Sequence, residues 1–305
     1  MFNTSTLYAR LKAMDIPCRE MVAMSHYTTM QVGGLASLVA FVRSAKELIT
    51  AVEEAKKNNV RFVVIGNGSN VIFADEGFQG LVIVTSEMKS YSFDGSAIKA
   101  DCGASLTKVA ADAQRAGLTG LEFAYGIPGT VGGGVFMNAG AYGGSLSDVV
   151  VSSICFDTQN NTIRKIDGNE HEFTYRHSIY TRNPNLVILA AMLQLAPGER
   201  NEIAATMNEH VRARKEKQPL EYPSAGSVFK RPEGYFAGKL IEDAGLKGFS
   251  IGGAQVSEKH AGFIINRGSA SAKDVNDLIE HIQKTVFDLY GVCLETEIIR
   301  LSAED

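Results

Sequence analysis

The segment 126–144 is the part of the chain best suited to hold a ligand. It reads Gly-Ile-Pro-Gly-Thr-Val-Gly-Gly-Gly-Val-Phe-Met-Asn-Ala-Gly-Ala-Tyr-Gly-Gly and holds 8 of the 30 glycines of the chain within 19 residues. Glycine lets backbone approach a ligand closely and reaches positive φ freely, but it costs entropy on folding. Successive backbone N–H groups in such loops bind phosphate oxygens. We therefore expect this segment, named here the glycine cradle, to bind a ligand.

A second glycine-containing loop, residues 66–70, follows the mostly apolar segment Val60–Ile65. Neither loop contains the GxxxxGK[ST] pattern of phosphate-binding nucleotidases. A dinucleotide fingerprint also fits poorly, because Val71 occupies the third glycine position and Val71–Phe73 is typical of a strand. An ordinary turn remains an alternative for this loop alone, since Gly and Asn clusters often form turns. One long ligand held by both loops explains them together, and flavin adenine dinucleotide (FAD) has a suitable pyrophosphate and a wide ring.

The composition is that of a globular protein with no excess of basic residues. Of its 305 residues, 45% are hydrophobic and 21% charged, and the formal net charge is −4, which gives no indication of nucleic-acid binding. The four cysteines form no CxxC pair and the six histidines show no metal-ligand spacing, so we expect no metal and no disulfide framework. With no signal peptide and no apolar run of membrane-spanning length, we expect a cytoplasmic monomer without a membrane partner.

Local patterns predict the elements that position these loops. Ser44–Glu47 resembles a capping box that begins a helix extending to about Asn58. A helix over 106–116 is expected to end at Gly117, and a hairpin turn is expected at Asp94-Gly95. The other predicted helices cover about 201–217, 236–244 and 274–290. The predicted strands are 60–65, 81–84, 97–102, 149–156, 162–166, 186–195, 261–266 and 294–301.

These elements predict a mixed α/β (α+β) fold in three regions. Residues 1–90 form a first FAD-binding subdomain, residues 91–199 a second one that contains the glycine cradle, and residues 200–305 a substrate-binding α/β domain. The strands between 149 and 195 are expected to form an antiparallel sheet. In the last predicted helix, the apolar residues recur at helical spacing and predict one buried face; they are Val275, Leu278, Ile279, Ile282, Val286 and Leu289.

Several motifs together resemble one family. The two glycine loops are similar to those of the vanillyl-alcohol-oxidase type of FAD-binding domain. The narrower sequence Gly-Ile-Pro-Gly-Thr-Val-Gly-Gly, followed by Met-Asn-Ala-Gly-Ala-Tyr-Gly, resembles the UDP-N-acetylenolpyruvoylglucosamine reductases of peptidoglycan precursor synthesis. The similarity extends from His26 to Ile298, which is nearly the whole chain.

The resemblance implies bound FAD, NADPH as the hydride donor, and a UDP-sugar whose enolpyruvyl group is reduced to a lactyl ether. The product would be UDP-N-acetylmuramate. The cofactor-binding residues that it implies are Gly66, Asn67, Gly68, Ser69, Asn70, Gly126, Pro128, Gly129, Thr130, Gly132, Gly133, Asn138, Gly140 and Ala141.

The reaction explains why the family needs three catalytic residues. Hydride delivered from flavin N5 to the vinyl carbon leaves negative charge on the adjacent carbon and its carboxylate, as an enediolate. Arg176, in Phe173-Thr-Tyr-Arg-His-Ser178, matches the family's arginine, whose planar fork suits that growing charge. Ser227, in Ser224-Ala-Gly-Ser-Val-Phe-Lys230, matches the proton donor. Without the resemblance, Arg176 would be interpreted as a surface ion-pair residue and Ser227 as a turn residue.

The third catalytic position is Glu297, in Leu294-Glu-Thr-Glu-Ile298. Glu295 is a close rival, because residues two apart on a strand share a face. The motif favours Glu297, which directly precedes the β-branched pair Ile298-Ile299. Beside an enediolate, Glu297 would help most as a protonated donor. Without the motif, an exposed edge-strand carboxylate would be the preferred interpretation.

Substrate contacts are carried over from the same resemblance. Lys230, Tyr235 and Lys239 would hold the UDP diphosphate, and Gln255 and Asn266 would contact the uracil or the sugar. A solvated basic face is the alternative for the lysines. The chain lacks room for the tyrosine-bearing loop of the family's longer class, because few residues separate Tyr180 from the strand at 186, and Arg231 stands where asparagine is frequent.

Two other functional classes remain open at this stage. A flavin oxidase of the same FAD fold would transfer electrons to oxygen, although such chains usually carry a larger substrate domain. A non-catalytic flavin- or UDP-sugar-binding module would retain the loops without turnover, which the presence of Arg176, Ser227 and Glu297 disfavours.

Overall fold

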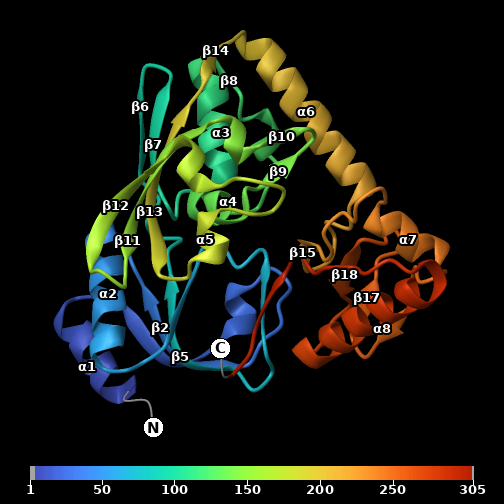
Figure 1. Ribbon diagram of the computed structural model, residues 1–305, viewed down its shortest axis with the longest axis horizontal. Helices are drawn as coiled ribbons and strands as arrows, with labels where there is room; N and C mark the ends of the chain where they lie inside the picture. Colours follow the sequence, from blue (N-terminus) through green and yellow to red (C-terminus); the bar gives the residue numbers. More distant parts are fainter. Residues whose placement is uncertain (1–3, 304–305) are drawn as a thin grey trace. The chain divides into compact units, whose positions relative to one another are not determined.

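The structure is a computed structural model that describes residues 4–303. The chain forms two compact units, each built from separate segments (Figure 1). Unit 1 contains Met1–Glu20, Leu38–Asn67 and Gly80–Arg214, and unit 2 contains Met21–Ser37, Gly68–Gln79 and Lys215–Asp305. The division of the sequence into three continuous regions stays a prediction.

The first part of the chain contains a four-stranded sheet in the order β1-β2-β5-β3. Strands β3 and β5 are parallel, with Val63 opposite Val82, as a mixed α/β fold requires. The elements here are α1 (Thr4–Ala13), β1 (Cys18–Ala23), η1 (Met24–Tyr27), β2 (Leu35–Phe41), α2 (Ala45–Lys57), β3 (Phe62–Ile65), β4 (Val71–Phe73) and β5 (Phe78–Val84).

Helix α2 begins at its predicted cap but uses only half of a capping box. The Ser44 side chain accepts a hydrogen bond from the Glu47 backbone N–H at 3.2 Å. The Glu47 carboxylate does not return to residue 44; it accepts from the backbone N–H of Arg43 at 2.8 Å. The preceding residue therefore takes the place of the usual reciprocal partner.

Antiparallel strands build the larger sheet of unit 1, in the order β12-β11-β13-β7-β6, and Figure 1 shows them side by side. This confirms the predicted antiparallel sheet and the hairpin at Gly95. The elements of this part of the chain are β6 (Tyr91–Asp94), β7 (Ala97–Asp101), α3 (Leu106–Ala116), β8 (Leu118–Thr119), η2 (Glu122–Ala124), α4 (Val131–Met137), β9 (Gly140–Ala141), β10 (Gly144–Ser145), η3 (Leu146–Asp148), β11 (Val150–Asp157), β12 (Thr162–Asp167), η4 (Gly168–His171), α5 (Ile179–Arg182), β13 (Leu186–Gln194), β14 (Ala196–Pro197) and α6 (Arg200–Lys217).

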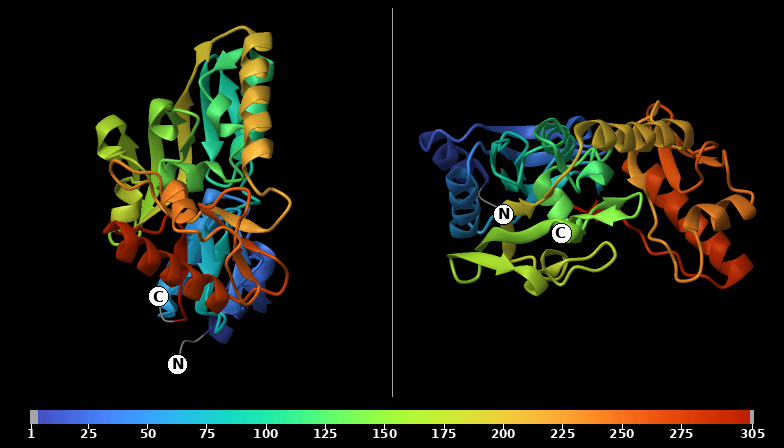
Figure 2. Two further views of the ribbon diagram at one scale, coloured as in Figure 1. Left: turned by 90° about the vertical axis from the view of Figure 1, so that its right-hand side faces the viewer. Right: turned by 90° about the horizontal axis from the view of Figure 1, so that it is seen from above.

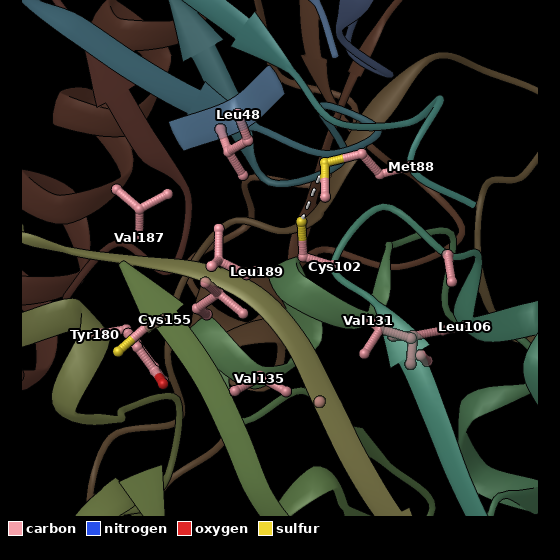
Figure 3. Close-up of a cluster of buried hydrophobic side chains, with 14 of the residues drawn as sticks. Leu48, Met88, Cys102, Leu106, Val131, Val135, Cys155, Tyr180, Val187 and Leu189 are labelled. Carbon is pink, nitrogen blue, oxygen red and sulfur yellow. Dashed lines mark hydrogen bonds between the residues drawn. The ribbon is translucent and has the colours of Figure 1, made fainter. Parts of the chain in front are cut away.

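One continuous apolar core fills unit 1. Figure 3 shows part of it, in which Leu106 of α3, Val131 and Val135 of α4, and Leu189 of β13 lie among buried neighbours. The thiol of Cys102 packs against the Met88 sulfur at 4.0 Å. Burial raises the pKa of that thiol to about 12, which makes it an unreactive packing residue.

The second core belongs to unit 2, where α8 lies alongside strand β17 (Figures 1 and 2). The sheet order is β15-β18-β17-β16. Val275, Ile279 and Ile282 of α8 are fully or almost fully buried, and each such side chain contributes about 1.5–3 kcal/mol on burial. The elements are β15 (Ser224–Ser227), α7 (Ala237–Asp243), β16 (Ser250–Ile251), β17 (Ala254–Val256), β18 (Phe263–Asn266), α8 (Ala272–Tyr290) and β19 (Ile299–Leu301).

Three further features differ from the sequence analysis. Leu289 is 58% exposed and is not part of the buried face, because it lies in the last turn of α8, next to the C-cap Gly291. The expected strand over 294–301 is regular only at Ile299–Leu301, which pairs in parallel with β4. Helix α4, within the glycine cradle, was not expected, because its three consecutive glycines disfavour helix.

Candidate active site

Thr130 and Asn138 delimit a short helix inside the glycine cradle. Thr130 is the N-cap of α4, and its hydroxyl accepts from the Gly133 N–H at 3.2 Å. Asn138 ends the helix in the left-handed region, with φ 42°. Beyond it, Tyr142 and Gly143, both at positive φ, make the two-residue turn between β9 and β10, as type I′ hairpins require.

Gly66 and Asn67, the unit 1 residues of the loop 66–70, contact the cradle. A Cβ on Gly66 would lie 2.3 Å from the Thr130 hydroxyl, so only glycine fits there. The Asn67 amide donates to the Pro128 carbonyl at 3.1 Å. The two glycine loops that the sequence assigns to one ligand are therefore in contact at these residues.

The cradle glycines have different physical roles. A Cβ on Gly132 would lie 2.7 Å from the Cys102 Cβ, and one on Gly140 would lie 2.5 Å from the Gly144 carbonyl oxygen. These two glycines are needed for packing. A Cβ on Gly133 would meet only the Thr130 hydroxyl, at 3.5 Å, and Gly133 is exposed. Gly133 thus presents accessible backbone of the kind that a flat cofactor needs for close approach.

The remaining cradle residues are placed as follows. The Gly129 carbonyl accepts from the Leu106 N–H at 3.1 Å. Ala141 is opposite Gly144 in the β9–β10 pair. The Gly126 carbonyl accepts from Arg214 of α6.

Arg214 is a residue of this site that the sequence does not distinguish from the other basic residues of the helix over 201–217, which are Arg212, Lys215 and Lys217. Its guanidinium bonds to the cradle at Gly126, and burial lowers its pKa. One helical turn earlier on α6, His210 stacks on the Tyr142 ring with centroids 4.3 Å apart. Only the position of α6 beside the cradle distinguishes Arg214 from its basic neighbours.

Arg176 lies at the tip of a tight turn, named here the Arg176 turn (Thr174–His177). Thr174 and His177 exchange backbone hydrogen bonds of 3.2 Å, which leaves Tyr175 and Arg176 as the two central residues. Arg176 has φ 56°, at a position where such turns favour glycine or asparagine. Its guanidinium donates to the Gly140 carbonyl at 3.1 Å and lies 5.0 Å from the Tyr175 ring centre. The arginine is therefore held against the glycine cradle.

Asn138 connects the cradle to the same turn. Its amide nitrogen donates to the Thr174 carbonyl at 3.0 Å, and its amide oxygen accepts from the Ser147 N–H at 2.9 Å. Ser178, just after the turn, donates to the Phe136 carbonyl of α4 at 2.7 Å. Asn138 was predicted as a cofactor contact; its side chain joins elements, and any contact with the cofactor stays a prediction.

In unit 2, the main chain of Glu297 bonds to the Asn70 side chain and to Val228, the residue after Ser227. Glu297 N–H donates to the Val228 carbonyl at 2.7 Å, so the segment after Ser227 runs beside the segment that carries Glu297. The Asn70 side chain donates to the Glu297 carbonyl at 3.1 Å. Three residues predicted from separate motifs therefore lie on neighbouring segments.

The unit 2 part of the loop 66–70 is also constrained by its neighbours. Gly68 has φ 61°, and a Cβ there would lie 1.9 Å from the Tyr27 carbonyl oxygen. Its own carbonyl accepts from the Thr29 N–H at 3.1 Å. Ser69, the next residue, is half-buried.

The two rival glutamates differ in environment. Glu295 is exposed, and its carboxylate pairs with the Lys230 ammonium at 3.3 Å. Glu297 is half-buried. Neither lies on a regular strand, so strand alternation does not put their side chains on one face. Glu297, whose backbone N–H bonds to the Val228 carbonyl, is the better placed of the two, and its assignment stays a prediction.

The predicted substrate residues all lie in unit 2. Tyr235 is 49% exposed, and Lys239 pairs with Asp243 on the surface of α7. The Gln255 amide donates to the Gly248 carbonyl at 3.0 Å. Asn266 is buried; its oxygen accepts from Gly268 N–H and its nitrogen donates to the Met30 carbonyl. It borders a cavity of about 360 Å³ that is also lined by Gln31, Tyr222, Pro223, Arg267, Gly268 and Ser269.

Residues 4–303 contain neither a cluster of metal ligands nor a membrane-spanning helix. In that range no three or more His, Cys, Asp or Glu side chains gather as metal ligands do. No helix there combines the length and the apolar character that crossing a membrane requires.

Comparison with known proteins decides the family. Residues 218–301 match the C-terminal domain of UDP-N-acetylenolpyruvoylglucosamine reductase, and residues 36–167 match an FAD-binding domain. The reductase of Pediococcus pentosaceus is 48% identical over 284 residues, which is 93% of this chain and 94% of that protein. The chain belongs to the UDP-N-acetylenolpyruvoylglucosamine reductase family.

Other members of the reductase family extend the match along the chain. The reductase of Lactiplantibacillus plantarum is 46% identical over 302 residues, 99% of this chain and 98% of that protein. The crystal structure of the reductase from Thermus caldophilus matches with a TM-score of 0.81 and 35% identity, over 94% of this chain and 99% of that one. The predicted mixed α/β fold, the FAD-binding region and the oxidoreductase class are thereby confirmed.

Proposed function

We propose that the protein reduces the enolpyruvyl ether of UDP-N-acetylglucosamine enolpyruvate to UDP-N-acetylmuramate, for peptidoglycan precursor synthesis. FAD, when bound, supplies the hydride that it takes from NADPH. The glycine loops would hold FAD, and exposed Gly133 supports this because a side chain there would fill the space that the cofactor needs. The family match over more than nine-tenths of the chain carries the assignment of the reaction.

Arg176 would bind the substrate carboxylate, where negative charge grows as the double bond is reduced. A guanidinium fixed in position stabilises that charge without reorganising during the reaction. The observation that carries this role is the backbone of Arg176, which keeps φ 56° at a position favouring glycine. Such strain of about 1–3 kcal/mol persists mainly where function requires the residue.

Ser227 would donate the proton and Glu297 would stabilise the enediolate. Their support is the main-chain pairing that places Glu297 opposite Val228, the residue after Ser227. A serine hydroxyl is a weak acid, so it must recover its proton from neighbours or water. Substrate binding is assigned to Lys230, Tyr235, Lys239, Gln255 and Asn266. We place the reaction in the cytoplasm and expect a monomer.

An anaerobic absorbance titration tests the reaction. The FAD-loaded protein is bleached with NADPH and then given UDP-N-acetylglucosamine enolpyruvate. We expect the yellow colour to return only with that substrate, in proportion to the amount added. Recovery of colour with air alone and no response to the substrate would replace the reductase with an oxidase, and failure to bind FAD would refute the assignment of the glycine loops.

A further inference from the structure

We propose that Ser153, which no sequence motif singles out, is a positioning residue for Arg176. Its hydroxyl joins the two ends of the segment that carries the Arg176 turn. Together with His171 and Tyr180 it forms a buried group, named here the Ser153 clasp. The inference rests on the proposed role of Arg176, and the experiments below separate the two.

The clasp consists of two short hydrogen bonds to one atom. Ser153 lies on β11, opposite Ile166 of β12 and Ala191 of β13, and it has no exposed surface. Its Oγ is 2.7 Å from His171 Nε2 and 2.6 Å from the Tyr180 hydroxyl. His171 and Tyr180 are also buried, so no water competes for these bonds.

The direction of each hydrogen bond follows from one backbone carbonyl. His171 Nδ1 is 3.0 Å from the Gly168 carbonyl oxygen, which can only accept, so Nδ1 carries the hydrogen. Neutral His171 then accepts at Nε2 from the Ser153 hydroxyl, and the remaining donor, Tyr180 O–H, donates to Ser153 Oγ. Burial lowers the pKa of His171, which favours this neutral form.

The position of the clasp in the chain gives it its role. His171 is the last residue of η4 and Tyr180 is in α5, so the clasp closes the base of the segment 172–179. That segment contains two non-glycine residues at positive φ, Glu172 at 51° and Arg176 at 56°. Strained backbone of this kind persists only when its surroundings hold it firmly.

The far side of the segment is tied to the cradle, while the clasp ties its base to the sheet. Asn138 and Ser178 bond the segment to α4, and Arg176 bonds to Gly140. Tyr180 reaches into the core beside Cys155, as Figure 3 shows. Loss of the Ser153 hydroxyl would release the base from the rigid sheet and widen the range of positions open to the Arg176 guanidinium.

The decisive variants are Ser153→Ala and Tyr180→Phe, each of which removes a single hydroxyl. We expect kcat to fall about 10- to 100-fold, as displacements near 1 Å cause, with KM for the UDP-sugar changed less than about threefold. Ser152→Ala is the matched control, because residue 152 is buried on the same strand and points to the opposite sheet face. It should keep kcat within about twofold.

Combination with Arg176→Lys separates positioning from a general loss of stability. If Ser153 acts through Arg176, adding Ser153→Ala to Arg176→Lys should lower kcat less than about twofold further. If the double variant loses kcat by the product of the two single-variant losses, the proposal is wrong. A Ser153→Ala protein with a lower melting temperature but an unchanged kcat would also overturn the proposal.

Hydrogen exchange of the FAD-loaded protein gives a readout independent of turnover. The amides of 172–179 should exchange faster in Ser153→Ala and Tyr180→Phe than in the control, while those of β7 stay unchanged. Unchanged exchange in 172–179 would overturn the clasp. If Arg176→Lys turns over normally but exchange responds as expected, the proposed role of Arg176 fails and the clasp stands as a structural device.

Discussion

At the scale of single residues, Ser227 is the proton donor that we propose, and its hydroxyl is a weak acid. It ends β15, just after Gly226 at φ 77°, and is half-buried. General acid catalysis of this kind contributes about 10²–10⁴-fold to a rate. Its role is therefore tested by separating the two halves of the reaction.

Ser227→Ala should leave the reduction of bound flavin by NADPH unchanged and slow product formation about 10²–10⁴-fold. Stopped-flow absorbance measures the first step, and product analysis measures the second. Ser224→Ala is the control, because the Ser224 carbonyl, not its hydroxyl, accepts the Thr29 bond of 2.7 Å. Normal product formation by Ser227→Ala would assign the proton to another group.

Glu297 and Glu295 form a matched pair for a second test. Glu297→Gln should lower kcat about 10- to 100-fold, since the amide keeps a donor but loses the acid. Glu295→Gln breaks only an exposed ion pair with Lys230, a contact worth about 0–1 kcal/mol, and should change kcat less than about twofold. Steady-state kinetics of both variants decide the choice, and the reverse ranking would reassign the catalytic carboxylate to Glu295.

At the scale of elements, the short helix α4 contains adjacent glycines with opposite requirements. Gly132 packs on Cys102 and tolerates no Cβ, whereas Gly133 is exposed with room for one. In this helix, Gly132 therefore faces the core and Gly133 faces solvent. Substitutions at these two neighbouring glycines can therefore separate an effect on stability from an effect on FAD binding.

Gly133→Ala should keep the melting temperature of the FAD-free protein, or raise it slightly because alanine favours helix. It should weaken FAD binding at least tenfold, because the added methyl group occupies the approach to the backbone. Gly132→Ala should lower the melting temperature directly, through overpacking worth about 1–3 kcal/mol. FAD titration and thermal melts measure both, and unaltered FAD affinity in Gly133→Ala would remove this residue from the cofactor site.

At the scale of the whole molecule, each unit has a histidine that favours the neutral form, the buried His171 and the half-buried His260. Burial lowers the pKa of His171 in unit 1, near the carboxylates of Asp167 and Glu170. It also lowers the pKa of His260 in unit 2, near Lys247 and Glu242. Below about pH 6.5 the unfolded chain takes up protons that these folded histidines resist.

The free energy of unfolding should therefore fall as the pH drops from about 6.5, by at most about 1.4 kcal/mol per pH unit for each histidine. The stability that comes from holding these two imidazoles in the neutral form is fully present above that pH. Chemical denaturation between pH 8 and pH 5 measures the slope, and His260→Gln should reduce it. A slope that is flat over this range, or unchanged in His260→Gln, would contradict the prediction.

Much of the fold was predictable because it depends on neighbours in the sequence. Helix α3 begins after Ser105, whose side chain caps it, and ends at Gly117 with φ 75°; both signals are local. The glycine loops and the motifs around Arg176, Ser227 and Glu297 were sufficient to predict the family, which the comparisons confirm. Composition and periodicity alone would have left a flavin oxidase or a binding module open.

By itself, the sequence determined helices α2, α3, α6, α7 and α8, the strands between 149 and 195, the FAD-binding class and the reductase family. Only the tertiary structure showed that Gly132 is a packing residue, that Glu295 pairs with Lys230, and that Arg214 bonds to the cradle. It also brought Ser153, His171 and Tyr180 together. These contacts join residues far apart in the chain, and short-range periodicity and capping rules contain no information about which distant segments will meet.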